Sequence, residues 1–142
     1  MKINIGCGKK KYNGFVNIDK LIIHKPDILW DIEFGLPPMI KENTVTHVVA
    51  HHILEHINRY EQLMIDIHKV CKPGAKIDIL VPEAPGEPAF RDPTHVRFFT
   101  KNSFLYFDEW RYLYGYPHFK TFLIRHDTSP DKNLHVILEV IK

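Results

Sequence analysis

The chain has 142 residues, of which 44% are hydrophobic and 25% charged, and its formal net charge is +2. This length and composition are ordinary for a globular protein with one core, so we expect a single domain over residues 1–142. The small net charge gives no electrostatic reason to expect a nucleic-acid or membrane partner. We find no apolar run long enough to span a bilayer, and residues 2–5 read as a polar strand without signal-peptide character, so we expect a cytoplasmic location.

The first nineteen residues carry the strongest pattern. Residues 2–5 predict a short strand that leads directly into Gly6-Cys7-Gly8, and a second strand-like run over residues 15–18 ends at Asp19. Glycines have no Cβ and therefore let the backbone approach a ligand closely. A carboxylate after the second strand can accept hydrogen bonds from both hydroxyls of a ribose. The pattern predicts a nucleotide-type cofactor site at the carboxyl ends of the strands.

The middle of the chain alternates between strand and helix signals. Residues 45–50 form an apolar, β-branched run that is typical of a buried parallel strand. Asn58, followed three residues later by Glu61, is typical of a helix N-cap, and apolar residues at helical spacing extend this helix to Lys72-Pro73-Gly74. Residues 76–81 predict a further strand.

The last third begins with a long loop. Residues 82–93 contain four prolines, and a loop of this length in a compact domain is usually functional or mobile. Thr100 is a suitable N-cap for a helix through Phe107, and residues 121–125 and 134–141 predict an antiparallel hairpin. The element order predicts an α/β, three-layer, Rossmann-like fold whose mainly parallel sheet ends in this hairpin.

Several of these segments resemble known motifs. Residues 3–8 and 14–19 resemble the first motifs of class I S-adenosylmethionine-dependent methyltransferases. Residues 48–56 are similar to the motif after the fourth strand of that family, and residues 70–75 to the turn before its fifth strand. The resemblance covers roughly residues 2–107 and is nearest to the small methyltransferases of the type 11 kind.

The resemblance implies a cofactor and an activity. It implies S-adenosylmethionine as the cofactor and methyl transfer to a small-molecule or sugar-like acceptor. Gly6, Cys7 and Gly8 would pass beneath the methionine part of this cofactor, and Asp19 would bind the ribose hydroxyls.

The resemblance also assigns the other walls of the cofactor site. Asp31, with Ile32 beside it, would meet the adenine amino group. Ala50 and His51, at the end of the fourth strand, would line the sulfonium and methionyl side.

The chain departs from the family pattern at the first crossover. Lys10 stands where the family commonly has a third glycine, and residues 9–12 are too few for the usual crossover helix. The helices that precede the first strand in the family are also missing. We therefore expect an abbreviated domain in which no helix covers one face of the sheet. Either a partner, such as a second copy in a homodimer, covers this face, or the domain is less stable.

A cofactor-binding but catalytically degenerate partner subunit is the alternative function. A NAD-type Rossmann module is disfavoured, because the third glycine and its helix are absent.

Two histidines are candidates for the base that a protonated acceptor requires. They are His51, at a strand end, and His95, in the segment after the proline-rich loop. We assign His95 and Arg97 to the substrate side. The competing interpretation is that Asp92 and His95 only anchor the loop by hydrogen bonds.

His52, Glu55 and His56 form a pattern that zinc hydrolases also use. No third ligand stands at a recognisable spacing, and the pattern directly follows a buried strand, so we predict no metal. We expect Glu55 and His56 to brace the turn between strand and helix. The alternative is that His52 or Glu55 lines the cofactor cavity.

Overall fold

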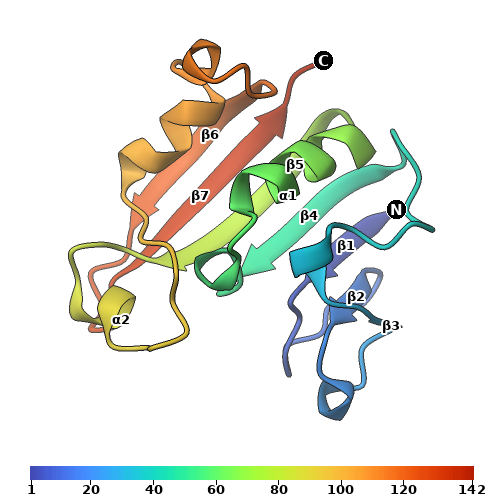
Figure 1. Ribbon diagram of the computed structural model, residues 1–142, viewed down its shortest axis with the longest axis horizontal. Coiled ribbons are helices and arrows are strands. Elements are labelled where there is room, and N and C mark those ends of the chain that lie inside the picture. The colour runs from blue at the N-terminus through green and yellow to red at the C-terminus, as the bar shows by residue number, and fades with distance from the viewer.

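The computed structural model describes residues 1–142 and contains a seven-stranded sheet of order β3-β2-β1-β4-β5-β7-β6 (Figure 1). Strands β1 to β5 are parallel to one another, whereas β7 is antiparallel to both β5 and β6. This topology confirms the predicted Rossmann-like sheet with a C-terminal antiparallel hairpin. The strands are β1 Lys2–Ile5, β2 Val16–Asp19, β3 Ile28–Leu29, β4 Val45–His51, β5 Cys71–Pro82, β6 Phe119–His126 and β7 Asn133–Val140.

One row of side chains shows how the sheet forms its core. Ile3, Val48, Ile77 and Leu138 lie side by side across β1, β4, β5 and β7, and each is fully buried. Because side chains alternate between faces along a strand, their chain neighbours point to the opposite face of the sheet. The face that carries this row is the apolar one.

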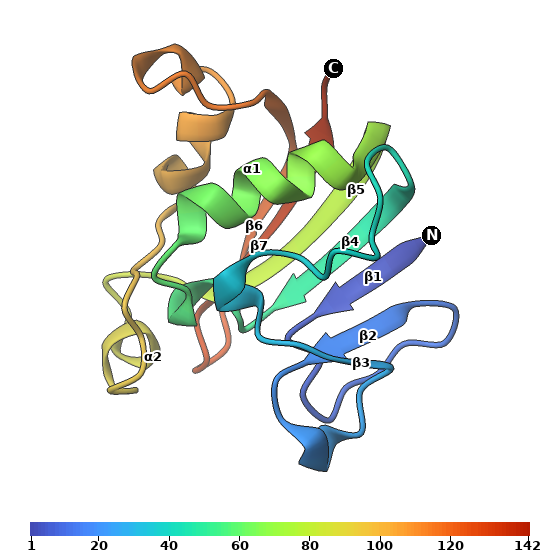
Figure 2. The same ribbon diagram turned by 45° about the vertical axis from the view of Figure 1, so that its right-hand side comes forward.

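Helix α1, Tyr60–Val70, lies over this apolar face (Figure 2). The sequence predicts this helix, and the structure confirms it. No helix in the chain has the length and apolar character needed to cross a membrane. The buried side chains of α1 recur at helical spacing and join the sheet in one core: Tyr60, Leu63, Met64, Ile67 and Val70.

The predicted N-cap of this helix is wrong. Asn58 and Arg59 donate their backbone N–H groups to the carboxylate of Glu33, at 3.0 and 3.2 Å, so a carboxylate from the short helical turn Ile32–Phe34 caps α1. A negative charge at a helix N-terminus is favourable because it satisfies free N–H groups and opposes the helix dipole. Glu61, the expected capping partner, instead accepts a hydrogen bond from Arg97 at 2.9 Å. By contrast, Thr100 caps the helical segment Lys101–Phe107 as expected, donating its N–H to Ser103 Oγ at 3.0 Å.

The first crossover contains no helix, as the sequence predicts. Residues 6–15 join β1 to β2 as a loop, and short helical turns replace longer helices elsewhere. This loop places the rings of Tyr12 and Phe15 against His51 and His47 on the face opposite α1. The short segments are η1 Ile22–His24, η2 Ile32–Phe34, η3 Leu54–His56, α2 Glu87–Phe90, η4 Lys101–Phe107 and η5 Arg111–Leu113.

Two isoleucines of α1 test how much the contact between helix and sheet contributes to the stability of the fold. Ile67 is fully buried, whereas Ile65 on the same helix is 36% exposed. Ile67→Ala should lower the free energy of unfolding by about 2–5 kcal/mol, because it removes a buried side chain and leaves a cavity. Chemical denaturation measures this loss. The matched variant Ile65→Ala should lose much less, and equal losses would contradict the burial assigned to α1.

Candidate functional site

A cavity of about 540 Å³ opens at the carboxyl ends of β1, β2 and β4. Strand β1 has β2 on one side and β4 on the other, so the cavity lies where the strand order reverses. Open α/β sheets bind their ligands at this point, and the volume is within the range of cofactor sites. Its lining residues are Gly6, Gly8, Asp19, Lys20, Leu21, His24, Trp30, Asp31, Ile32, Glu33, His52, Ile53, His56, Ile57, Asn58 and Thr94.

The glycine turn forms one wall of this cavity. Gly6 has φ +62°, and a Cβ at this position would lie 2.5 Å from Ile53 Cγ1, so only glycine fits. Gly8 has φ +50°, and a Cβ there would meet no atom within 4 Å. The backbone at Gly8 is therefore open to a ligand, as the cofactor assignment requires.

Asp19, at the end of β2, joins the glycine turn to the next segment. Its Oδ2 accepts the Gly8 N–H and its Oδ1 accepts the Leu21 N–H, both at 2.8 Å, and His24 Nδ1 lies 3.2 Å from Oδ1. Burial alone would raise the pKa of Asp19, but the hydrogen bonds from the Leu21 and Gly8 N–H groups and the nearby His24 ring outweigh it and lower this pKa. A carboxylate has about four acceptor positions, so room remains for ligand hydroxyls.

Two further residues assigned to the cofactor line the cavity. Asp31 accepts the Glu33 N–H at 3.0 Å and caps η2, and its other oxygen lies 3.8 Å from Lys20 Nζ. Ile32 is nearly buried beside it. Cys7 and Ala50 are buried and do not line the cavity. Burial, followed by the charge of Asp19, raises the pKa of the Cys7 thiol, which keeps it neutral.

His51 also lies outside the cavity. Its Nε2 is 2.9 Å from Asp78 Oδ1, and its Nδ1 is 3.4 Å from the Tyr12 hydroxyl, on the face opposite α1. His135 Nε2 contacts the same Asp78 oxygen at 2.8 Å. Burial alone would raise the pKa of Asp78, but hydrogen bonds from the two imidazoles lower it.

A second cavity of about 260 Å³ adjoins the first. His52 and His56 line both cavities, so these two side chains form the wall between them. Eight polar or charged residues and two prolines line the second cavity: His52, Glu55, His56, Pro82, Pro88, Arg91, Asp92, His95, Asp131 and Asn133. This composition suits a small polar ligand.

The segment after α2 packs against η3 and completes this second cavity. The N–H groups of Val96 and Arg97 both donate to the Glu55 carbonyl, at 2.9 and 3.2 Å. His95 therefore lies beside His56, with ring centroids 4.8 Å apart. Asp92 and His95 also make the anchoring hydrogen bonds that the competing interpretation expected, to Thr94 and to the Ala89 carbonyl.

Arg97 is directed away from His95. Its guanidinium donates to the carbonyls of Ile57 and Asn58 and to Glu61. It lines a third cavity, of about 580 Å³, whose walls are largely aromatic. The structure thus separates the two residues assigned to the substrate, and Arg97 fixes the start of α1.

The sequence analysis did not nominate several lining residues. Ile53 fills the volume left by Gly6, and Trp30, just before Asp31, donates Nε1–H to the Gly35 carbonyl at 2.9 Å. The only local signal for Trp30 was its position next to Asp31. Ile53 could not be found from the sequence, because its role depends on the approach of β1 to β4.

The lowered pKa of Asp19 makes a prediction about stability. A carboxylate with a folded-state pKa below its unfolded value stabilises the fold above the unfolded pKa, about 3.9 for aspartate, and loses this contribution as pH falls through the folded pKa. Asp19→Asn should therefore be less stable than the parent chain at pH 7. Denaturation at several pH values should show this difference shrinking below about pH 4. A difference that is constant with pH would contradict the assigned hydrogen bonds.

Comparisons with known proteins report on the fold. No protein-family model and no curated protein matches the chain. Among solved structures, a SAM-dependent methyltransferase from Archaeoglobus fulgidus is 14% identical, with a TM-score of 0.73 over 97% of this chain and 85% of that one. The 1,6-didemethyltoxoflavin-N1-methyltransferase from Burkholderia thailandensis, solved with its substrate and S-adenosylhomocysteine, is 12% identical, with a TM-score of 0.69 over 99% and 71%.

A third similar structure acts on a different class of acceptor. The 16S rRNA (adenine(1408)-N(1))-methyltransferase from Catenulisporales acidiphilia is 12% identical, with a TM-score of 0.68 over 99% of this chain and 84% of that one. At such low identities the comparison establishes the fold and leaves the acceptor open. The chain has the fold of S-adenosylmethionine-dependent methyltransferases in an abbreviated form.

Proposed function

We propose that the chain binds S-adenosylmethionine in the cavity at the carboxyl ends of β1, β2 and β4 and transfers its methyl group. The observation that carries this proposal is the position of Asp19. Its carboxylate is tied to the glycine turn at the point of the sheet where the strand order reverses, and it keeps free acceptor positions.

Different residues of the cavity would contact different parts of the cofactor. Asp19 would accept the ribose hydroxyls, Asp31 and Ile32 would contact the adenine, and the backbone around Gly8 would lie beneath the methionine part. The open space above Gly8 supports this fit. Bound there, the cofactor supplies an activated methyl group that a nucleophile takes by in-line displacement.

The methyl acceptor would occupy the adjoining polar cavity, whose walls favour a small-molecule or sugar-like compound. His95 is our candidate for accepting a proton from it. Its Nδ1 contacts the Ala89 carbonyl at 2.8 Å and must donate there, so Nε2 keeps its lone pair. We do not retain His51 for this role, because its ring lies on the opposite sheet face.

The alternative, a cofactor-binding subunit without activity, is motivated by the abbreviated crossover. Only a loop carries Tyr12 and Phe15 over the second sheet face, and we keep a homodimer as a prediction for that face. A screen of polar acceptors with labelled S-adenosylmethionine separates the two functions. Methylated product supports the enzyme, whereas cofactor binding without product from any acceptor would select the alternative.

Calorimetry with S-adenosylhomocysteine tests the cofactor assignment directly. Asp19→Ala should weaken binding by about 1–3 kcal/mol, the cost of leaving hydrogen-bonding groups without partners. Asp127→Ala is the matched control, because Asp127 also accepts a backbone N–H at 2.8 Å but lies between β6 and β7, away from the cavity. An unchanged affinity for Asp19→Ala would refute the ribose assignment, and no binding to the parent chain would refute the proposed cofactor.

A further inference from the structure

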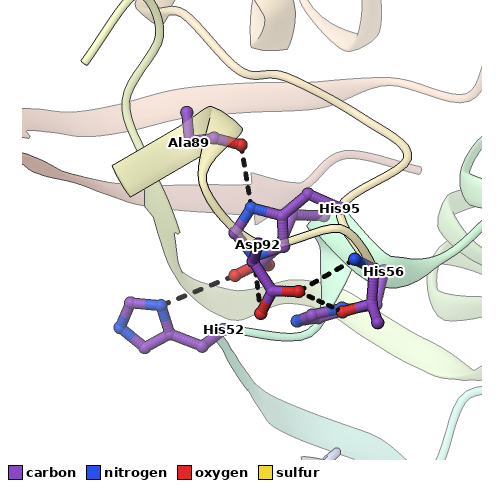
Figure 3. Close-up of polar contacts among 7 residues, drawn as sticks. His52, His56, Ala89, Asp92 and His95 are labelled. Carbon is purple, nitrogen blue, oxygen red and sulfur yellow. Dashed lines mark hydrogen bonds and ion pairs between the residues drawn. The ribbon is translucent and has the colours of Figure 1, made fainter. Parts of the chain in front are cut away.

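Three side chains with metal-ligating atoms converge at the second cavity. One oxygen of Glu55 and one ring nitrogen each of His56 and His95 lie within 4.8 Å of one another. Glu55 and His56 belong to η3, whereas His95 comes from the segment after α2. Figure 3 shows His56 and His95 beside each other. The docking of that segment on the Glu55 carbonyl brings the three groups together.

The hydrogen bonds of His95 fix the state of its ring. Its Nδ1 lies 2.8 Å from the Ala89 carbonyl oxygen, which can only accept, so this nitrogen carries the proton (Figure 3). In the neutral ring Nε2 then carries the lone pair, and this atom lies 3.8 Å from Asp92 Oδ2. A backbone carbonyl bound to one ring nitrogen is a common way to orient a histidine that ligates a metal through the other.

Two consecutive hydrogen bonds through Thr94 determine which nitrogen of the His56 ring carries the proton. Thr94 Oγ1 donates its proton to Asp92 Oδ1 at 2.7 Å, because an ionised carboxylate can only accept. Thr94 Oγ1 must then accept from His56 Nδ1, which lies 3.0 Å away. Nε2 of His56 is left with a lone pair, as in His95, and the two rings lie close together (Figure 3).

Glu55 provides an independent indication that something binds here. The residue is 1% exposed and lines the cavity, yet its Oε2 has no hydrogen-bond partner. Its Oε1 lies 3.5 Å from His52 Nδ1. A buried carboxylate oxygen without a partner is costly, and a side chain that only braced the turn would direct both oxygens to donors.

We propose that Glu55, His56 and His95 bind a Zn²⁺ ion. Two imidazoles and one carboxylate form a three-ligand set that zinc uses when a fourth position stays open, and imidazole favours zinc over Mg²⁺ or Ca²⁺. Donor atoms around a tetrahedral zinc lie about 3.4 Å apart, so binding would draw together any of the three side chains whose ligating atoms are farther apart than this. The sequence argument against a metal was the lack of a third ligand, and the fold supplies His95.

The position of this site relates it to the proposed function. His56 lines both cavities, so the ion lies at their boundary and its open position can hold an oxygen of the acceptor. This role rests on the proposed methyl transfer and would replace the base role of His95. Zinc binding itself is independent of it, because the three ligands are complete without cofactor or acceptor.

Metal titration of the purified full chain tests the site without any need for activity. After treatment with a chelator and dialysis, the chain should take up about one Zn²⁺ per molecule, and Zn²⁺ should raise its melting temperature. Co²⁺ in place of Zn²⁺ should give the visible absorption bands of a four-coordinate site. Uptake well below one equivalent, with no shift of the melting temperature, would overturn the proposal, whatever the calorimetry with S-adenosylhomocysteine shows.

Four variants separate a built site from adventitious binding. His56→Asn and His95→Asn should each weaken Zn²⁺ binding at least about 100-fold, and Thr94→Val, which breaks the hydrogen bond to His56, about 10–100-fold. His126→Asn is the control, because His126 contacts a carboxylate oxygen of Glu83 at 2.8 Å outside the cluster. Circular dichroism checks that each variant is folded. Equal affinity in His56→Asn, His95→Asn and the control would mean adventitious zinc and overturn the assignment.

Glu55→Gln gives a readout that a bracing role would not produce. The substitution keeps the shape of the side chain and removes a buried charge whose Oε2 has no partner. In the absence of metal this variant should melt at the same or a higher temperature than the parent chain, while losing the stabilisation by Zn²⁺. Lower metal-free stability together with unchanged zinc stabilisation would identify Glu55 as a brace and overturn its role as a ligand.

Discussion

The contact between Gly6 and Ile53 sets the geometry on which both cavities depend. A Cβ on Gly6 would lie 2.5 Å from Ile53, whereas two carbon atoms normally approach no closer than about 3.5–4.0 Å. The ends of β1 and β4 can therefore come this close only because Gly6 has no side chain. Ile53 then forms the floor of the cofactor cavity, and η3, which starts at the next residue, carries His56 into the wall between the cavities. A change at Gly6 would displace both sites at once.

The missing crossover helix is replaced by a buried polar network. Asn4 Nδ2 donates to the Lys10 carbonyl at 2.9 Å and to Asn17 Oδ1 at 3.0 Å, and Asn17 Oδ1 also accepts the Tyr12 N–H. Both asparagines are nearly fully buried, and the second amide is further bound by Asp27. A buried network of this kind is tolerated only when its groups are satisfied, and it then specifies one path for the chain. The loop over residues 6–15 is thus held in place without the apolar contacts of a helix.

The features that could be predicted from the sequence are those set by local pattern. The end of the strand pattern in β2 placed Asp19 at the carboxyl ends of the strands, and helical periodicity located α1. The same alternation puts His51 on the face of His47, opposite Ala50, so a stricter reading of β4 would have separated His51 from the cavity. The capping of α1 by Glu33 and the position of His95 beside His56 could not be predicted, because each depends on how a short segment packs against an element distant in the sequence.

The three residues at the second cavity admit two chemical interpretations, a free base or a metal site, and Glu55 distinguishes them. A free histidine base needs one orienting partner for its ring, which Ala89 supplies to His95 and Thr94 supplies to His56. It does not need a fully buried carboxylate with an oxygen that lacks any partner. Burying such a group without a partner is costly, and a bound cation compensates for this cost. A cation held by Glu55, His56 and His95 provides that compensation, because one ligating atom of each residue lies within 4.8 Å of the other two.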